Sequence, residues 1–247
     1  MSKIYRDRYL FILFIPGLLY FLIFKYLPMF GIAIAFKNYD IFDGFINSKW
    51  VGLKHFLSFI NGPYFLMIIR NTVLLNVYGL LFSFPIPIIF AILLNEIKTN
   101  WFKRITQTVS YLPHFVSTVV IVGMIIDFLS PTNGLISLGI SKLTNKEPIF
   151  YMAKSEYFRT IYIVSGIWQH MGWSSIIYLS ALTGIDPTLY EAATVDGANR
   201  FHKMIHITIP GIMPTIVICF ILNLGSILDV GFEKVFLLQN SLNFDNS

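Results

Sequence analysis

Apolar and polar positions alternate in long blocks along this chain. Five runs of mostly apolar residues are separated by polar connections. A helix needs about 20 residues to cross the hydrocarbon layer of a bilayer, and each run reaches that length. The five runs are therefore predicted to be membrane-spanning helices over residues 9–30, 72–94, 106–129, 160–182 and 211–230. This pattern predicts an all-α, polytopic helical membrane protein whose residues 1–247 form a single transmembrane domain.

Prolines interrupt this pattern within the runs or at their ends. A proline inside a membrane helix leaves a backbone carbonyl without its partner, which neighbouring helices or water must then satisfy. Pro85 and Pro87 lie close together, so the second span is predicted to be bent or broken. Such a bend can serve packing alone or can open a cavity of the kind transporters use. Pro210 is predicted to end a short helix just before the last span.

Composition and charge support a membrane location. Of the 247 residues, 55% are hydrophobic and 13% are charged, whereas about a quarter of a soluble domain is charged. The net charge of +5 comes from bases scattered singly along loops, which does not resemble a nucleic-acid-binding patch. Lys and Arg near span ends are denser on the side that holds the N-terminus and residues 186–210. That side is therefore predicted to face the cytoplasm.

Residues 186–210 carry a different pattern, with small residues and a sharp turn between two apolar runs. Asp186 and Pro187 are a typical helix start, because Asp caps free amides and Pro fits the first helical position. Gly197 is suited to the positive φ that ends a helix and turns the chain. A second short helix through Phe201 is expected to follow. The segment is thus predicted to be two short helices that meet at an angle, which a mere connector does not need.

The same segment resembles the cytoplasmic signature of the permease subunits of ABC importers. The matching residues are Glu191, Ala192, Ala193, Gly197, Ile207, Ile209 and Pro210. Two positions depart conservatively from the family pattern, since Ile replaces the usual Leu before the proline and Met204 lies where the family often has an aromatic residue. Other stretches, including "WVGLKHF", "RNT" and "YLPHFVSTVV", resemble the sugar-importer branch, and within it the permeases for oligosaccharides.

This resemblance implies a type I ABC importer permease fold and a set of partners. The partners are a pair of ATPase subunits, a second permease, most often a different one, an extracytoplasmic solute-binding protein and membrane lipid. Residues 186–210 would dock the ATPase through Glu191, Ala192, Ala193, Asp196, Gly197, Ala198, Phe201 and Pro210. The resemblance also implies a sixth helix, so the last span is expected to be missing from this chain.

The sequence offers no site for covalent chemistry. It lacks the G-x-x-x-x-G-K-[ST] loop that cradles nucleotide phosphates, so ATP hydrolysis is expected on a separate subunit and the chain is not predicted to be an enzyme. His202 and His206 are spaced to share a helix face, but no further metal ligand accompanies them. Neither a cofactor nor a metal is expected.

Candidates for the sugar path lie in the fourth and fifth spans. Aromatic rings can stack on sugar rings, while amides and acids can bind hydroxyl groups. The candidates are Trp168, Gln169, Trp173, Tyr178, Asn223 and Asp229. Trp and Tyr also concentrate at membrane interfaces without any ligand, so both interpretations remain open. The alternative functions are an ABC permease for another solute, such as a peptide, phosphate or polyamine, and a truncated remnant that does not transport.

Overall fold

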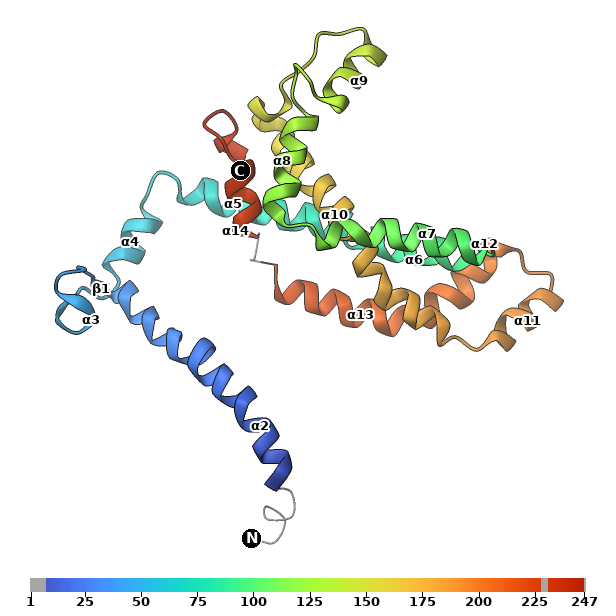
Figure 1. Cartoon of the computed structure of the whole chain (residues 1–247), viewed down its shortest axis with the longest axis horizontal. Coiled ribbons are helices and arrows are strands. Elements are labelled where there is room, and N and C mark those ends of the chain that lie inside the picture. The colour runs from blue at the N-terminus through green and yellow to red at the C-terminus, as the bar shows by residue number, and fades with distance from the viewer. Residues whose placement is uncertain (1–7, 228–230, 247) are drawn as a thin grey trace. The chain divides into compact units, whose positions relative to one another are not determined.

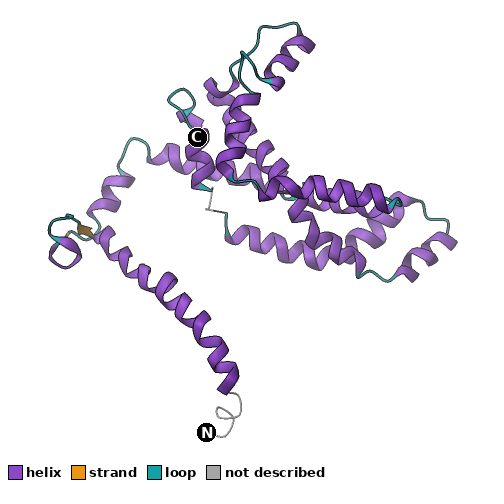
Figure 2. Ribbon diagram, viewed as in Figure 1, coloured by secondary structure: helices purple, strands orange, loops and turns teal. Residues whose placement is uncertain are grey.

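The computed structural model of the chain describes residues 8–227 and 231–246. They are mostly helical, as Figure 2 shows, and the strands among them are β1 (Lys37–Asn38) and β2 (Lys49–Trp50), which pair antiparallel. The prediction of an all-α protein is confirmed. The chain packs as two compact units, residues 1–66 and residues 67–247.

The first unit is an apolar helix followed by a small folded element. The helix runs through α2 (Arg8–Phe21), the π turn η1 (Leu22–Tyr26) and the 3₁₀ segment η2 (Leu27–Phe36). The hairpin of β1 and β2, α3 (Gly44–Asn47) and α4 (Lys54–Ile60) come next (Figure 1). Phe36 stacks on Trp50 and also packs against Phe56, so the end of the helix anchors this element.

The second unit is built around one long helix, α10 (Ser155–Thr183), which packs against α6, α7, α13 and α14. Its other elements, in chain order, are α5 (Phe65–Tyr78), η3 (Gly79–Ser83), α6 (Pro85–Glu96), α7 (Asn100–Tyr111), η4 (Leu112–Phe115), α8 (Thr118–Phe128), α9 (Leu135–Thr144), η5 (Tyr151–Ala153), α11 (Pro187–Val195), α12 (Arg200–Lys203), η6 (Met204–Thr208), α13 (Ile209–Gly225), α14 (Phe232–Leu238) and η7 (Phe244–Asn246). The first two residues of α5 belong to the first unit.

Within the described ranges, three helices are long and apolar enough to cross a membrane: Tyr9–Phe36, Phe65–Glu96 and Arg200–Gly225. The predicted third span is not straight, because Asn100–Phe115 and Thr118–Phe128 meet at 103°. Pro113 lies just before this bend. The predicted fourth span lies within α10, which carries many Ser, Thr and amide side chains and does not meet the same test of length and composition. The number of spans stays a prediction.

Three π turns explain how the long helices accommodate proline. Each turn ends two residues before a proline: η1 before Pro28, η3 before Pro85 and η6 before Pro210. A proline ring clashes with the carbonyl four residues earlier and offers it no N–H. Widening the turn moves that carbonyl aside. The second span is therefore continuous and is not broken at Pro85, and the helix at Pro210 does not end there.

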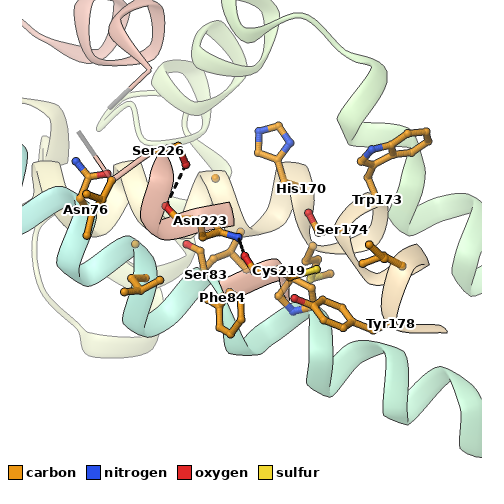
Figure 3. Close-up of a pocket in the computed structure, with 18 of the residues that line it drawn as sticks. Asn76, Ser83, Phe84, His170, Trp173, Ser174, Tyr178, Cys219, Asn223 and Ser226 are labelled. Carbon is orange, nitrogen blue, oxygen red and sulfur yellow. Dashed lines mark hydrogen bonds between the residues drawn. The ribbon is translucent and has the colours of Figure 1, made fainter. Parts of the chain in front are cut away.

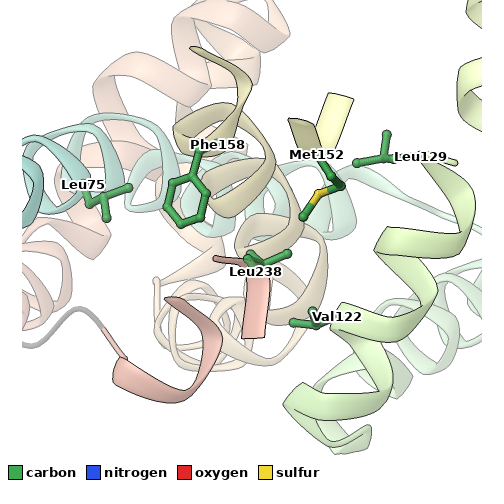
Figure 4. Close-up of a cluster of buried hydrophobic side chains, with 6 residues drawn as sticks. All are labelled: Leu75, Val122, Leu129, Met152, Phe158 and Leu238. Atoms are coloured by element: carbon green, nitrogen blue, oxygen red, sulfur yellow. The ribbon is translucent and has the colours of Figure 1, made fainter. Parts of the chain in front are cut away.

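Two buried clusters hold the second unit together. The first joins α5, α8, α10 and α14 through Leu75, Val122, Leu129, Met152, Phe158 and Leu238 (Figure 4). The second joins α6, α10 and α13 through Ala91, Ile92, Tyr178, Leu182, Ile212 and Cys219. Between α7 and α10 the backbones approach closely at Gly172, where any Cβ would collide with the Ser110 carbonyl. These contacts fix the frame in which the functional side chains lie.

The last described residues are tied back to this frame by amide side chains. Asn243 is 1% exposed and donates hydrogen bonds to the carbonyls of Met152 and Leu238. Arg159 on α10 donates to Asn71 and to Asn246. Buried amides need partners of this kind, and together with the bonds from Arg159 they hold residues 239–246 and α14 against α10.

Candidate functional site

The first half of the segment 186–210 is a capped helix that ends in a sharp turn. Asp186 Oδ1 accepts a hydrogen bond of 2.9 Å from the Thr188 amide, and Pro187 occupies the first turn of α11. This bond lowers the pKa of the Asp186 carboxyl from its usual value. Gly197 has a φ of 79°, a conformation that glycine adopts without strain. The helix start and the corner that the sequence predicts are both present.

The second half folds back and is braced against the first. Asn199 caps α12 by accepting a bond of 2.9 Å from the His202 amide. Lys203 Nζ donates to Thr194 Oγ1 at 2.6 Å, and the hydroxyls of Tyr190 and Thr208 lie 3.0 Å apart. These bonds join the two arms on either side of Gly197. We call residues 186–208 the elbow.

The second arm of the elbow is continuous with a predicted span. The prediction that Pro210 ends this arm is wrong, because one helix runs from Arg200 to Gly225 through the π turn η6. The π turn removes the clash that would otherwise have ended the helix. The second arm of the elbow and α13 therefore form one helix.

The outer face of the elbow is exposed and partly apolar. Of the residues selected from the sequence, Ala193 and Ala198 are half-buried, and Glu191, Ala192, Asp196, Gly197, Phe201 and Pro210 are exposed. Sequence reasoning missed Leu189 and Val195, whose side chains are 51% and 89% exposed. The signal was present, since Leu189, Ala192 and Val195 recur every three residues and so share a helix face. An exposed apolar face of this kind is typical of a contact surface.

The second candidate site is a cavity of about 870 Å³ inside the second unit. Figure 3 shows side chains from α5, η3, α6, α10 and α13 around it. The lining is mainly apolar, with polar groups from Asn76, Ser83, His170, Ser174, Asn223 and Ser226. A largely apolar cavity with a few polar groups is typical of a small-molecule site.

The structure brings part of the predicted sugar path to this cavity. Trp173, Tyr178 and Asn223 line it (Figure 3). Trp168 is 43% exposed and is not part of the wall. Gln169 is buried and reaches the Val116 carbonyl at 3.5 Å. Asp229 lies outside the described residues.

A pair of histidines beside the cavity has no counterpart among the selected residues. The Nδ1 atoms of His114 and His170 lie 3.1 Å apart. The His114 ring stacks on Trp173 with centroids 4.6 Å apart and planes 5° apart. The two histidines are separated by 56 residues, so no local pattern could have paired them. Within residues 8–227 and 231–246, no three His, Cys, Asp or Glu side chains gather in a way that could hold a metal ion.

Comparisons with known proteins agree with this architecture. The model of the family "binding-protein-dependent transport system inner membrane component" matches residues 83–232. The chain is 46% identical over 243 residues to protein LplB of Bacillus subtilis, covering 98% of the chain and 76% of that protein. It is 45% identical, over 98% of the chain and 75% of the relative, to the polygalacturonan/rhamnogalacturonan transport system permease protein YteP of the same organism.

A solved structure is similar over nearly the whole chain. It is the crystal structure of a bacterial ABC transporter involved in the import of the acidic polysaccharide alginate, with a TM-score of 0.90 and 38% identity. The match covers 99% of this chain and 82% of that one.

The apolar helices, the exposed elbow and the cavity define a helical membrane permease. The chain belongs to the family of binding-protein-dependent transport system inner membrane components, which are the permease subunits of ABC importers. A subunit of this kind is not itself an enzyme, since the ATPase is a separate subunit. The resemblance inferred from the sequence is thereby confirmed.

Proposed function

We propose that this chain forms the path for a carbohydrate, an oligosaccharide, in an ATP-driven importer, and that the elbow couples that path to separate ATPase subunits. The names of two similar proteins support the choice of solute. YteP is named for polygalacturonan and rhamnogalacturonan transport, and the similar crystal structure is of an alginate importer.

The observation that carries this proposal is the continuity between elbow and cavity. The helix Arg200–Gly225 begins in the elbow and then contributes Cys219 and Asn223 to the cavity wall. The bonds across Gly197 let the elbow move as one body. A partner that moves the elbow therefore also moves the wall of the cavity.

The proposed assembly supplies the energy and the solute. Two ATPase subunits close on binding ATP, one against this elbow and one against that of a second permease, which is similar but not identical. An extracytoplasmic binding protein delivers the sugar. Alternating access requires a differential affinity for the two states, and nucleotide supplies it at the ATPases. The chain lies in the cytoplasmic membrane, with its N-terminus and the elbow in the cytoplasm, as one transmembrane domain with five spans.

Within this proposal, ten residues contact the ATPase. Eight are those predicted from the sequence, Glu191, Ala192, Ala193, Asp196, Gly197, Ala198, Phe201 and Pro210, and we add Leu189 and Val195 because their side chains are exposed. Trp173, Tyr178 and Asn223 are the path residues that the cavity supports. Trp168, Gln169 and Asp229 stay predictions from the sequence.

The proposal is tested by purifying the tagged chain gently from its own membrane. The wild type is expected to bring down an ATPase and a second permease. Gly197→Pro should lose the ATPase, because proline fixes φ near −65° and the corner needs 79°. Gly225→Ala is the matched control, since a Cβ there meets open space, and it should retain both partners.

The solute is tested with the same complex in proteoliposomes. ATP-driven uptake of an oligosaccharide supports the proposed function. Uptake of a peptide, phosphate or polyamine in its place would contradict the solute but leave the coupling role intact. Retention of the ATPase by Gly197→Pro would contradict the coupling role.

A further inference from the structure

The His114–His170 pair is a proton-sharing unit at the edge of the cavity. A neutral imidazole has one N–H and one acceptor nitrogen. Because the two Nδ1 atoms are 3.1 Å apart, one of them donates to the other, and a single proton lies between them. When the pair takes up one more proton, both Nε2 atoms carry N–H groups. The protonated pair then offers two donors and one positive charge.

An aromatic surface adjoins this pair. Trp173 stacks on the His114 ring. Phe115 packs edge-on against Trp173, with ring centroids 5.4 Å apart. His170 and Trp173 both line the cavity (Figure 3). A flat ring face and one imidazole of the pair, that of His170, therefore lie at the cavity wall.

The charge around this end is positive. Lys234 on α14 donates to the Tyr162 carbonyl at 2.9 Å and lies over the Tyr162 ring. Burial lowers the pKa of Lys234 to about 8, so it remains mostly protonated at pH 7. Tyr162 and Gly166, which Lys234 touches, both line the cavity.

No acidic side chain balances this charge among the described residues of the wall. The described wall residues include no Asp, Glu, Lys or Arg, and the described titratable groups in the wall or against it are His114, His170, Lys234, Tyr162, Tyr178 and Cys219. A neutral sugar gains nothing from uncompensated positive charge. A carboxylate gains charge-assisted hydrogen bonds, which are stronger than neutral ones.

We propose that the cavity selects oligosaccharides that carry carboxylates, that is, uronic acid residues. His170, whose ring is bonded to that of His114, binds the carboxylate, and the Trp173 ring faces the sugar ring. Lys234, which lies behind the wall against Tyr162, adds positive charge. This inference rests on the proposed function and narrows its substrate class.

The test compares each acidic sugar with its neutral counterpart in proteoliposomes that hold the complete transporter. The probes are trimers of galacturonate and of mannuronate, each with its methyl ester. The wild type is expected to take up at least one acid about tenfold faster than its ester. His114→Asn keeps a polar group for the His170 bond but cannot be protonated, so it should lower the preference several-fold by slowing the acid alone.

The matched control is His55→Asn, because His55 lies in the first unit and bonds only to the Lys37 carbonyl among the described residues. This variant should leave the preference unchanged. Equal uptake of acid and ester, or faster uptake of the ester, would overturn the inference while leaving carbohydrate import intact. If the transporter takes up neither the acid nor the ester but takes up another class of solute, both the proposed function and the inference are overturned. An unchanged preference in His114→Asn would overturn the role of the pair.

Discussion

The elbow and the cavity belong to the same unit but are held together differently. The elbow is made of consecutive residues, and its bonds join positions between 2 and 18 residues apart. The cavity takes its wall from residues between Leu75 and Ile227, and the histidines beside it are 56 residues apart. The short-range bonds make the elbow rigid, which its proposed role in coupling requires. A cavity that must open and close needs walls on separate helices, which can move against one another.

The first way to break this comparison is to separate α10, which contributes to the cavity wall, from α7, which packs against it. Gly172→Val places side-chain atoms against the Ser110 backbone, which cannot yield as a flexible side chain does. Overpacking of this kind costs about 1–3 kcal/mol or more, so the melting temperature in detergent should fall by about 5 °C or more. Little folded protein is expected.

The control for this prediction is Gly123→Val, because Gly123 on α8 has open space around its Cα. It should melt within about 2 °C of the wild type. If both variants melt alike, the close approach of α7 and α10 does not hold α10 in place.

The next variant fills the cavity and leaves the elbow intact. Ser174→Trp puts a large ring at an exposed position of the wall. Uptake should fall more than about tenfold, while the ATPase still copurifies, because binding sites tolerate little lost volume. Leu222→Trp on α13, which is 67% exposed and outside the wall, should transport normally. Normal uptake by Ser174→Trp would show that solute takes another route.

The sequence predicts the elbow well because the chemistry of its turns is local. Asp186, Pro187 and Gly197 each have a preferred role at a helix end, and each performs it. The error at Pro210 has a physical cause. The π turn moves aside the carbonyl that proline would otherwise clash with, and the sequence pattern did not predict that turn. The all-helical fold follows from the length of the apolar runs.

The cavity could be predicted only in part. Trp173, Tyr178 and Asn223 were selected because aromatic rings can stack on sugar rings and amides can bind hydroxyl groups, and these three line the wall. His114 was missed because its role depends on a partner on α10, which only the packing of η4 against α10 brings close. Periodicity within one helix cannot place residues of different helices together.

A third prediction tests whether the elbow acts through its exposed face. Val195→Glu adds charge where the side chain is 89% exposed, so folding should be unaffected. A buried charge at a contact surface should weaken ATPase binding about tenfold, or on the order of 1.4 kcal/mol. The measurement is the ATPase concentration needed for half-maximal association with the purified chain.

Leu143→Glu is the matched control, since Leu143 on α9 is 86% exposed and lies outside the elbow. It should bind the ATPase as the wild type does. Equal binding by Val195→Glu would remove this face from the coupling contact and leave the corner at Gly197 as the remaining candidate.

The smallest effect is expected at the first cap of the elbow and depends on pH. The pKa of Asp186 is lowered in the folded state by the bond from the Thr188 amide. The cap is therefore fully present above the usual pKa of the carboxyl and is lost as pH falls through the lower folded value. Asp186→Asn keeps a capping oxygen at every pH, whereas Asp186→Ala keeps none.

Hydrogen exchange at residues 187–195, corrected for intrinsic rates, measures this cap directly. In the wild type, protection should be higher at pH 6 than at pH 3. In Asp186→Asn it should be independent of pH, and in Asp186→Ala it should be low at both. ATPase association at pH 7 should change by less than about twofold in either variant, because the bonds between Lys203 and Thr194 and between Tyr190 and Thr208 still brace the elbow. Equal protection of the wild type at the two pH values would mean that the carboxylate does not hold α11, and that those braces alone keep the elbow rigid.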